Sequence, residues 1–412
     1  MRKTRILKRR RNPLNRFMIS REGVITGAAD DDPAGIATFL QMGATTGFSL
    51  LWLVPALLPL VSAVEEMSAR VGVVTKKGLA VVLRNTYGRK ITYAAALIVL
   101  ICNVVTISAN IAAMAEVLGN LLNINWLWLV APLIFILLII LVGKSYSIIS
   151  KYLLVSTIVL TVYIVAGFLV GPDWGEVLSA TVTPVLRLDN IILLAATAFV
   201  GTTIAPYLIF WQATEEIEDK TTVKDLQKET RGVVIGFALA QLIAFFAIVT
   251  AAVVFSGQTN FIPNAAQAAL SLRPIAGDLA FILFAIGILG SGIVSIPVLA
   301  ASTAYVGGDA LNIKSGLNFP FAQAKGFYII LIAAIILSGL LVFTNTLPML
   351  MLFYSQVLNG VLTPVLIILL MLITNNRKIM GKYTNGFWSN LFGVASIVLM
   401  LGLDIALLVT YL

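Results

Sequence analysis

Eleven apolar stretches, each close to the length that crosses a bilayer, constrain this chain more than any other feature of its sequence. A helix needs about 20 apolar residues to span a hydrocarbon core roughly 30 Å thick. With 59% hydrophobic and 11% charged residues, the composition is also far from that of a soluble domain. The sequence therefore predicts an all-α, multi-pass membrane protein. The predicted spans are residues 22–47, 49–68, 91–117, 125–143, 148–170, 190–212, 232–256, 276–305, 326–343, 347–374 and 390–411.

The basic residues predict how these spans are oriented. With a cytoplasmic N-terminus, 26 of the 28 Lys and Arg residues fall on the cytoplasmic side, and Arg187 and Arg273 fall outside. Cytoplasmic loops carry an excess of Lys and Arg. We therefore predict a plasma (inner) membrane protein with its N-terminus inside and, because the number of spans is odd, its C-terminus outside. The net charge of +9 then reflects topology and contact with membrane lipids, so we expect no nucleic-acid partner.

The chain lacks the residues that several classes of protein need for their function. The connections between spans are shorter than a folded domain, and no P-loop for ATP is present. The chain contains no histidine and one cysteine, Cys102, which excludes a histidine-dependent hydrolase and a disulfide framework. A membrane protease built on Asp32 and Asp404 stays as an alternative. We expect a secondary transporter, facilitator or channel, and no enzyme.

A run of three aspartates followed by proline interrupts the first span. Charge inside a membrane is costly, and proline removes a hydrogen bond from the helix. At about 1.5 Å per residue from Val24, Asp32 lies roughly 12 Å into the hydrocarbon core, close to its middle. We interpret this position as a functional site, because carboxylates at a helix break attract a cation. Asp30 and Asp31 would form an acidic vestibule or pair with other helices.

The sixth span contains a similar interruption at Pro206. An offset of five spans gives the first and sixth spans opposite orientations in the membrane. This arrangement is typical of inverted repeats whose unwound segments meet at a binding site near the midplane. Because three aspartates at the break would repel a carboxylate substrate, an amino-acid carrier is a weaker alternative than a cation transporter.

These residues resemble the NRAMP family of divalent metal transporters. Its DPGN motif is similar to Asp32, Pro33, Ala34 and Gly35, and its sixth-helix MPH motif to Ala205-Pro206-Tyr207. The stretches EEMSARVGVVTKKGLA, AEVLG and FYSQVLNGVLTP are also family-like. The resemblance implies a LeuT-like fold of two inverted five-helix repeats with broken helices 1 and 6, plus an eleventh helix.

The resemblance also implies a division of the chain. A basic cytoplasmic tail would occupy residues 1–21, and the first repeat residues 22–189. The second repeat would occupy residues 190–374, and residues 375–412 would form a cytoplasmic loop and the eleventh helix.

Two departures from the family motifs bear on the choice of metal. The family's Asn and Met ligands are replaced by Gly35 and Ala205, which leaves the carboxylate of Asp32. A thioether favours soft transition metals, whereas Mg²⁺ takes oxygen ligands and keeps part of its water. The chain thus resembles the NRAMP-related magnesium transporters, and we predict uptake of partly hydrated magnesium. A proton-coupled manganese or iron transporter is the alternative.

Proton coupling is expected to be absent. Tyr207 stands at the family's histidine position, and Ala113 replaces an acidic residue three positions before Glu116. A proton relay needs a chain of titratable groups across the membrane. We therefore predict alternating access driven by the cation gradient and the membrane potential.

The complete prediction for the site combines these matches with the carbonyl groups that a broken helix exposes. Gln356 and Asn359 share one face of the tenth span, where they bind metal-held water or bond a neighbouring helix. No cofactor is expected, because Mg²⁺ or Mn²⁺ is the substrate. The predicted metal contacts are Asp32, Gly35, Ala29, Thr202, Ala205, Gln356 and Asn359, and the predicted vestibule or pathway residues are Asp30, Asp31, Glu116 and Tyr207.

Overall fold

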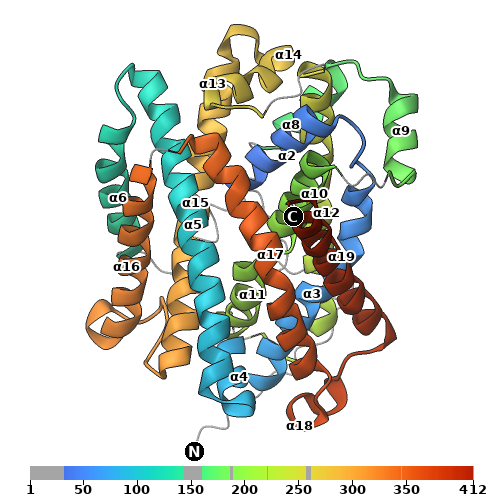
Figure 1. Ribbon diagram of the computed structural model, residues 1–412. Helices are drawn as coiled ribbons and strands as arrows, with labels where there is room; N and C mark the ends of the chain where they lie inside the picture. Colours follow the sequence, from blue (N-terminus) through green and yellow to red (C-terminus); the bar gives the residue numbers. More distant parts are fainter. Residues whose placement is uncertain are drawn as a thin grey trace, which may run out of the picture.

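The computed structural model shows a bundle of helices joined by short connections (Figure 1). It describes residues 32–142, 160–185, 189–219, 221–256, 261–344 and 346–411, and within these ranges no β-strand occurs. The helices are α2 Pro33–Thr46, α3 Leu53–Thr75, α4 Leu79–Tyr87, α5 Arg89–Leu122, α6 Leu127–Val142, α8 Val162–Leu169, α9 Trp174–Val182, α10 Asn190–Thr203, α11 Pro206–Glu218, α12 Leu226–Val254, α13 Ala265–Ala268, α14 Arg273–Ala276, α15 Ala280–Leu311, α16 Lys325–Leu341, α17 Pro348–Thr374, α18 Arg377–Met380 and α19 Phe387–Tyr411.

Seven helical segments of the described residues are long and apolar enough to cross a membrane. They correspond to the third, sixth, seventh, eighth, ninth, tenth and eleventh predicted spans. The other four predicted spans contain α2, α3, α6 and α8. Of these, α2, α6 and α8 are short, with 14, 16 and 8 residues, and α3 carries Glu65, Glu66 and Arg70 in its second half. Parts of the first, fourth and fifth predicted spans lie outside the described residues.

The chain is non-helical at both predicted breaks. Asp32 has an extended backbone, and α2 begins with Pro33. In the sixth span, α10 ends at Thr203, and α11 begins with Pro206 after an extended Ala205. Proline favours the first position of a helix because its fixed φ suits the helix and no N–H is lost there. The two prolines therefore start a new helix rather than kink a continuous one.

The helices pair reciprocally around these breaks. The half-helix α2 packs extensively against α12, and the half-helix α11 packs extensively against α3. Between them, the long helices α5 and α15 pack along each other. In Figure 1, α6 and α16 lie on one flank of the bundle and α19 on another. This pairing is the one expected when the first and sixth spans occupy equivalent places in two inverted repeats.

Two ends of the bundle serve as reference points. The α13 end carries α13 and α14, and the α4 end carries α4 and α18 (Figure 1). The half-helices α2 and α10 lie toward the α13 end, whereas α11 lies toward the α4 end. The two described breaks therefore lie in the middle of the bundle.

Glycines bring α10 and α17 into close contact beside the second break. A Cβ atom at Gly201 would overlap the backbone of Gln356 and Gly360, and one at Gly360 would overlap the carbonyl of Thr197. Small residues allow membrane helices to approach closely, which gives the packing that holds them together. The end of α10 is thus fixed against α17.

We predict that Gly201→Ala destabilises the protein, because the added methyl group would collide with backbone atoms that cannot rotate away. Overpacking of this kind costs about 1–3 kcal/mol. The melting temperature of the detergent-solubilised protein should therefore fall. Gly402→Ala is the matched control, since a Cβ there meets no atom within 4 Å. Equal melting temperatures for the two variants would contradict the predicted contact.

Candidate functional site

Asp32 caps the N-terminus of α2. Its Oδ1 atom accepts a hydrogen bond of 2.7 Å from the backbone N–H of Gly35. Aspartate is a preferred capping residue because its carboxylate satisfies an N–H group of the first helical turn and faces the positive end of the helix dipole. The side chain is 3% exposed. The sequence Asp-Pro therefore starts the helix and fixes a buried carboxylate at the same point.

Asn110 of α5 holds the other carboxylate oxygen. Its Nδ2 atom donates to Oδ2 of Asp32 over 3.0 Å and makes a longer contact of 3.4 Å with Oγ of Ser295 on α15. Because a carboxylate only accepts hydrogen bonds, this contact fixes the orientation of the amide. The buried Oδ1 atom of Asn110 has no hydrogen-bond partner among the described residues.

Asn110 was not among the site residues predicted from the sequence. The available signal was a pair of asparagines seven residues apart, on one face of an otherwise apolar span. The first of the pair, Asn103, donates to the carbonyl of Leu299 and to the hydroxyl of Thr303 on α15. The same face of α5 therefore fixes α15 and orients Asp32.

The charge of Asp32 is not balanced by a neighbouring cation in the described structure. Arg70 forms its ion pair with Glu66 within α3, at 2.9 Å, as their spacing predicts, and not with Asp32. A buried ionised carboxylate is costly unless a cation or hydrogen bonds compensate it. Within the described residues, no three His, Cys, Asp or Glu side chains gather to hold a metal. The described part of the site therefore contains one carboxylate, with the neutral side chains of Asn110 and Ser295 beside it.

The half-helices α2 and α10 are antiparallel, and the end of α2 lies at the same level of the bundle as the start of α10. The Gln41 side chain, near the end of α2, exchanges two hydrogen bonds with the backbone of Ile262. The preceding residue, Phe261, packs on a cluster that includes Leu193, near the start of α10. The end of α2 and the start of α10 therefore both reach the segment that leads into α13.

An aromatic contact sets the register between these half-helices. The rings of Phe39 on α2 and Phe199 on α10 meet edge to face, with their centroids 5.8 Å apart. Asp32 precedes Phe39 by seven residues, and Pro206 follows Phe199 by seven. At about 1.5 Å per residue, both positions lie roughly 10 Å from the aromatic pair. Asp32 and the break at Ala205 therefore lie at a similar depth.

The break between α10 and α11 exposes main-chain groups and few side-chain donors. Ala205 is buried and provides no side-chain cap for α11. Thr202 is buried in the last turn of α10, where helix carbonyls lack partners within the helix. The predicted contact Ala29 and the predicted vestibule residues Asp30 and Asp31 lie outside the described residues.

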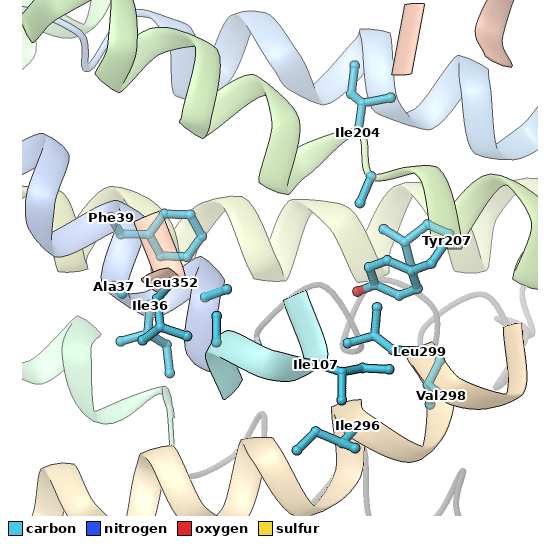
Figure 2. Close-up of a cluster of buried hydrophobic side chains, with 14 of the residues drawn as sticks. Ile36, Ala37, Phe39, Ile107, Ile204, Tyr207, Ile296, Val298, Leu299 and Leu352 are labelled. Carbon is cyan, nitrogen blue, oxygen red and sulfur yellow. The ribbon is translucent and has the colours of Figure 1, made fainter. Parts of the chain in front are cut away.

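Tyr207 is buried just after the break. Figure 2 shows its ring on the side of Leu299 of α15 and Ile107 of α5, which belong to the same buried cluster. The Tyr207 carbonyl accepts a hydrogen bond of 3.2 Å from the Ser302 hydroxyl of α15. This side of α11 therefore faces α15.

Gln356 and Asn359 form a hydrogen-bonded pair on α17. The Asn359 Nδ2 atom donates to Oε1 of Gln356 over 2.9 Å, so the two side chains share a face as their spacing predicts. The Oδ1 atom of Asn359 is buried and has no partner among the described residues. The pair therefore presents one free amide oxygen next to Gly360, the residue that α10 contacts.

Glu116 lies away from Asp32, toward the α13 end. It follows Asn110 by six residues on α5, or about 9 Å along the helix. Its Oε1 atom accepts a hydrogen bond of 3.1 Å from the N–H of Ala265, the first residue of α13. Together with the Gln41 contacts at 2.6 and 2.8 Å, this bond holds residues 261–265 across α2 and α5. We call these three hydrogen bonds the α13 latch.

Comparison with known proteins finds similarity to one family along almost the whole chain. Residues 23–410 match the family described as natural resistance-associated macrophage protein-like, Nramp. A divalent metal cation transporter MntH of Granulibacter bethesdensis is 25% identical over 405 residues, which cover 94% of this chain and 87% of the relative. A protein of the same name from Yersinia pestis is 26% identical over 415 residues and covers 98% of both chains.

Solved structures share the fold. The manganese transporter of Eremococcus coleocola, in complex with an aromatic bis-isothiourea compound, has a TM-score of 0.71 at 17% identity and covers 93% of this chain and 84% of its own. Mhp1, a nucleobase-cation-symport-1 family transporter, has a TM-score of 0.59 at 13% identity and covers 97% and 94%. MhsT in complex with L-phenylalanine has 0.58 at 14% identity and covers 95% and 99%. The predicted LeuT-like fold is thus confirmed.

We predict that Gln41→Leu opens the α13 latch. The substitution keeps the size of the side chain but removes both partners of the Ile262 backbone, and an unsatisfied buried group costs about 1–3 kcal/mol. Deuterium exchange of the peptide spanning residues 261–272 should become roughly ten- to a hundredfold faster. Gln267→Leu, at an exposed position of α13, is the control. Unchanged exchange in Gln41→Leu would show that the latch does not hold this segment.

Proposed function

The chain belongs to the Nramp family, and from this premise we propose that it transports divalent metal cations and takes partly hydrated magnesium as its preferred substrate. We further propose that transport proceeds by alternating access without proton coupling. The metal is cargo, so no cofactor takes part.

The observation that carries the proposal is the environment of the Asp32 carboxylate. It is buried, it has no cationic partner in the described structure, and the groups next to it are neutral: the Gly35 N–H, the Asn110 amide and, beside that amide, the Ser295 hydroxyl. Mg²⁺ prefers oxygen ligands and keeps several waters, which donate hydrogen bonds to neutral acceptors. A hydrated hard cation therefore fits this chemistry.

Ala205, at the second break, also supports magnesium as the preferred metal. It lies at the depth of Asp32 and contributes a main-chain carbonyl but no sulfur. A thioether would favour softer transition metals over magnesium. A methyl group at this position also leaves room for metal-bound water.

The proposed binding residues are Asp32 and Gly35 from the first break, Thr202 and Ala205 from the second, and the amide pair of α17. Gly35 takes part through the main chain, since its N–H already fixes Asp32. The free amide oxygen of Asn359 would accept a hydrogen bond from a metal-bound water. Ala29 would add a carbonyl, and Asp30 and Asp31 a vestibule.

The titratable groups around the site support the proposal of uncoupled transport. The chain contains no histidine, and the residue that follows Pro206 is Tyr207. Glu116 is engaged in the α13 latch, about 9 Å along α5 from the residue that holds Asp32. A proton relay across a membrane requires a chain of titratable groups. The metal gradient and the membrane potential would then drive transport.

The proposal includes an orientation and a division into repeats. The α4 end carries Lys76, Lys77, Arg84, Arg89 and Lys90 and is assigned to the cytoplasm by the positive-inside rule. The N-terminal tail, residues 1–21, would lie on that side and the C-terminus on the other. Residues 22–189 and 190–374 would form the two repeats.

A proton-coupled manganese transporter is the second candidate. It is favoured by the names of the similar proteins, which include a manganese transporter. Manganese also accepts carboxylate, carbonyl and water ligands. The two candidates differ in metal preference and in proton movement, and both can be measured in one assay.

We predict that Asp32→Ala abolishes magnesium flux, because the substitution removes the one carboxylate of the described site. Proteoliposomes loaded with dyes for magnesium and pH would report influx and internal acidification together. The wild-type protein should show magnesium influx without acidification. Asp404→Ala, which removes a carboxylate from the peripheral helix α19, is the matched control and should retain flux.

Two results would contradict this scheme. Normal magnesium flux through folded Asp32→Ala would remove Asp32 from the site. Manganese influx with acidification and no magnesium signal in the wild-type protein would favour the second candidate.

We predict that Ala205→Met shifts the preference of the transporter from magnesium toward manganese, because it adds a soft sulfur ligand at the break. Ala205→Leu is the matched control, since leucine has a similar volume without sulfur. The ratio of manganese to magnesium flux should rise at least several-fold in the methionine variant relative to the leucine variant. Equal ratios would show that residue 205 does not contact the metal.

A further inference from the structure

Glu65 on α3 is a second buried carboxylate, and unlike Asp32 it has no partner among the described residues. Its side chain is 0% exposed, and neither carboxylate oxygen has a hydrogen bond in the described structure. It also takes part in no ion pair among the described residues. An isolated buried carboxylate is strongly unfavourable as an anion unless a cation joins it. When Glu65 is ionised, the position therefore needs a cation that the described helices around it do not supply.

The face of α3 that carries Glu65 packs on α11. Three residues on, the Ser68 hydroxyl donates to the carbonyl of Ile209. Seven residues on, Gly72 packs so closely on Ala213 that a Cβ atom would overlap its carbonyl group. Residues at spacings of three and seven lie on one face of a helix, so Glu65 faces α11 as well.

These two contacts also fix the depth of Glu65. Both join residues that are 141 positions apart, so α3 and α11 run parallel with matched residues side by side. The same offset places Glu65 level with Pro206, the first residue of α11. The carboxylate therefore lies beside the break between α10 and α11.

The electrostatics of the break favour a cation held by a carboxylate there. The C-terminal carbonyls of α10 carry a partial negative charge that attracts a cation. The N-terminal N–H groups of α11 favour a carboxylate, and Ala205 provides no capping side chain. Asp32 has this relation to α2 already, since it caps that helix. Glu65 has the corresponding place beside α11.

Glu65 and Asp32 lie on different sides of α11. The partners of Asp32 are Asn110 on α5 and Ser295 next to it on α15, and the Tyr207 carbonyl of α11 also faces α15. Glu65 approaches from α3, on the side that Ile209 contacts. A cation at Glu65 would therefore occupy a position distinct from that of Asp32.

We propose that Glu65 binds a second divalent cation beside the break between α10 and α11, on the opposite side of α11 from the helices that hold Asp32. This inference rests on the proposed transport of divalent cations and adds a second binding position to it. Glu65 supplies two carboxylate oxygens, and the last carbonyls of α10 supply neutral oxygens. The chemistry suits a hard divalent cation that retains water.

The test counts bound metal with Mn²⁺ as the probe, because the electron paramagnetic resonance signal of free hydrated Mn²⁺ diminishes on binding. The purified full-length protein should bind two Mn²⁺ per chain. Glu65→Gln and Asp32→Ala should each bind one. Glu66→Gln is the matched control, because it removes the neighbouring carboxylate of α3, which is bonded to Arg70, and it should bind two.

A second readout separates metal binding from a purely structural role of Glu65. Without metal, Glu65→Gln should melt at a higher temperature than the wild-type protein, because an uncompensated buried charge is replaced by a neutral group of the same size. Added Mn²⁺ should then raise the melting temperature of the wild-type protein more than that of Glu65→Gln. Equal shifts would overturn the proposal.

The outcomes for the two carboxylates are distinguishable. If Glu65→Gln binds as many Mn²⁺ ions as the wild-type protein, the second position is refuted while the site at Asp32 stands. If Asp32→Ala binds as many as the wild type and Glu65→Gln binds one fewer, the Glu65 position stands and the proposed transport site fails. A wild-type protein that binds a single Mn²⁺, lost in Asp32→Ala alone, also refutes the proposal.

Discussion

A buried carboxylate at the start of a half-helix is the constraint on which the rest of the architecture depends. Asp32 can lie in the middle of an apolar bundle because α2 begins there, so that the first N–H groups of the helix point at it. The same interruption leaves main-chain groups that only protein interior or water can satisfy, since lipid offers no hydrogen bonds. The helices that enclose the break, α5, α12 and α15 among them, therefore separate it from the membrane.

The second break differs from the first in a way that bears on ion chemistry. Both begin with proline, but α2 has a capping carboxylate and α11 has Ala205. Inverted repeats superimpose the backbone rather than the side chains, so each half of a binding site can evolve different ligands on the same framework. The negative charge of the second half then comes from another helix, α3, whose Glu65 lies level with the start of α11.

How much of the structure the sequence predicts depends on how far apart along the chain the interacting residues lie. Local signals identified both helix starts, because Asp-Pro and Ala-Pro act within one turn, and the apolar stretches located most spans. The Glu66–Arg70 pair was also local. Asn110 was missed because its role depends on contact with Asp32, 78 residues away. The contact of Gln41 with Ile262 joins residues 221 positions apart, and the hydropathy pattern of the sequence does not predict it.

Through the α13 latch, α2 connects the site at Asp32 to the α13 end of the bundle. Gln41 follows Asp32 by nine residues, a length of about 13 Å, so a tilt of about 10° around Asp32 displaces Gln41 by roughly 2 Å. Two hydrogen bonds of 2.6 and 2.8 Å do not survive such a displacement. A small rotation of α2 at the bound ion would thus break both hydrogen bonds between Gln41 and Ile262. Conversely, an intact α13 latch would hold the Asp32 carboxylate in one place.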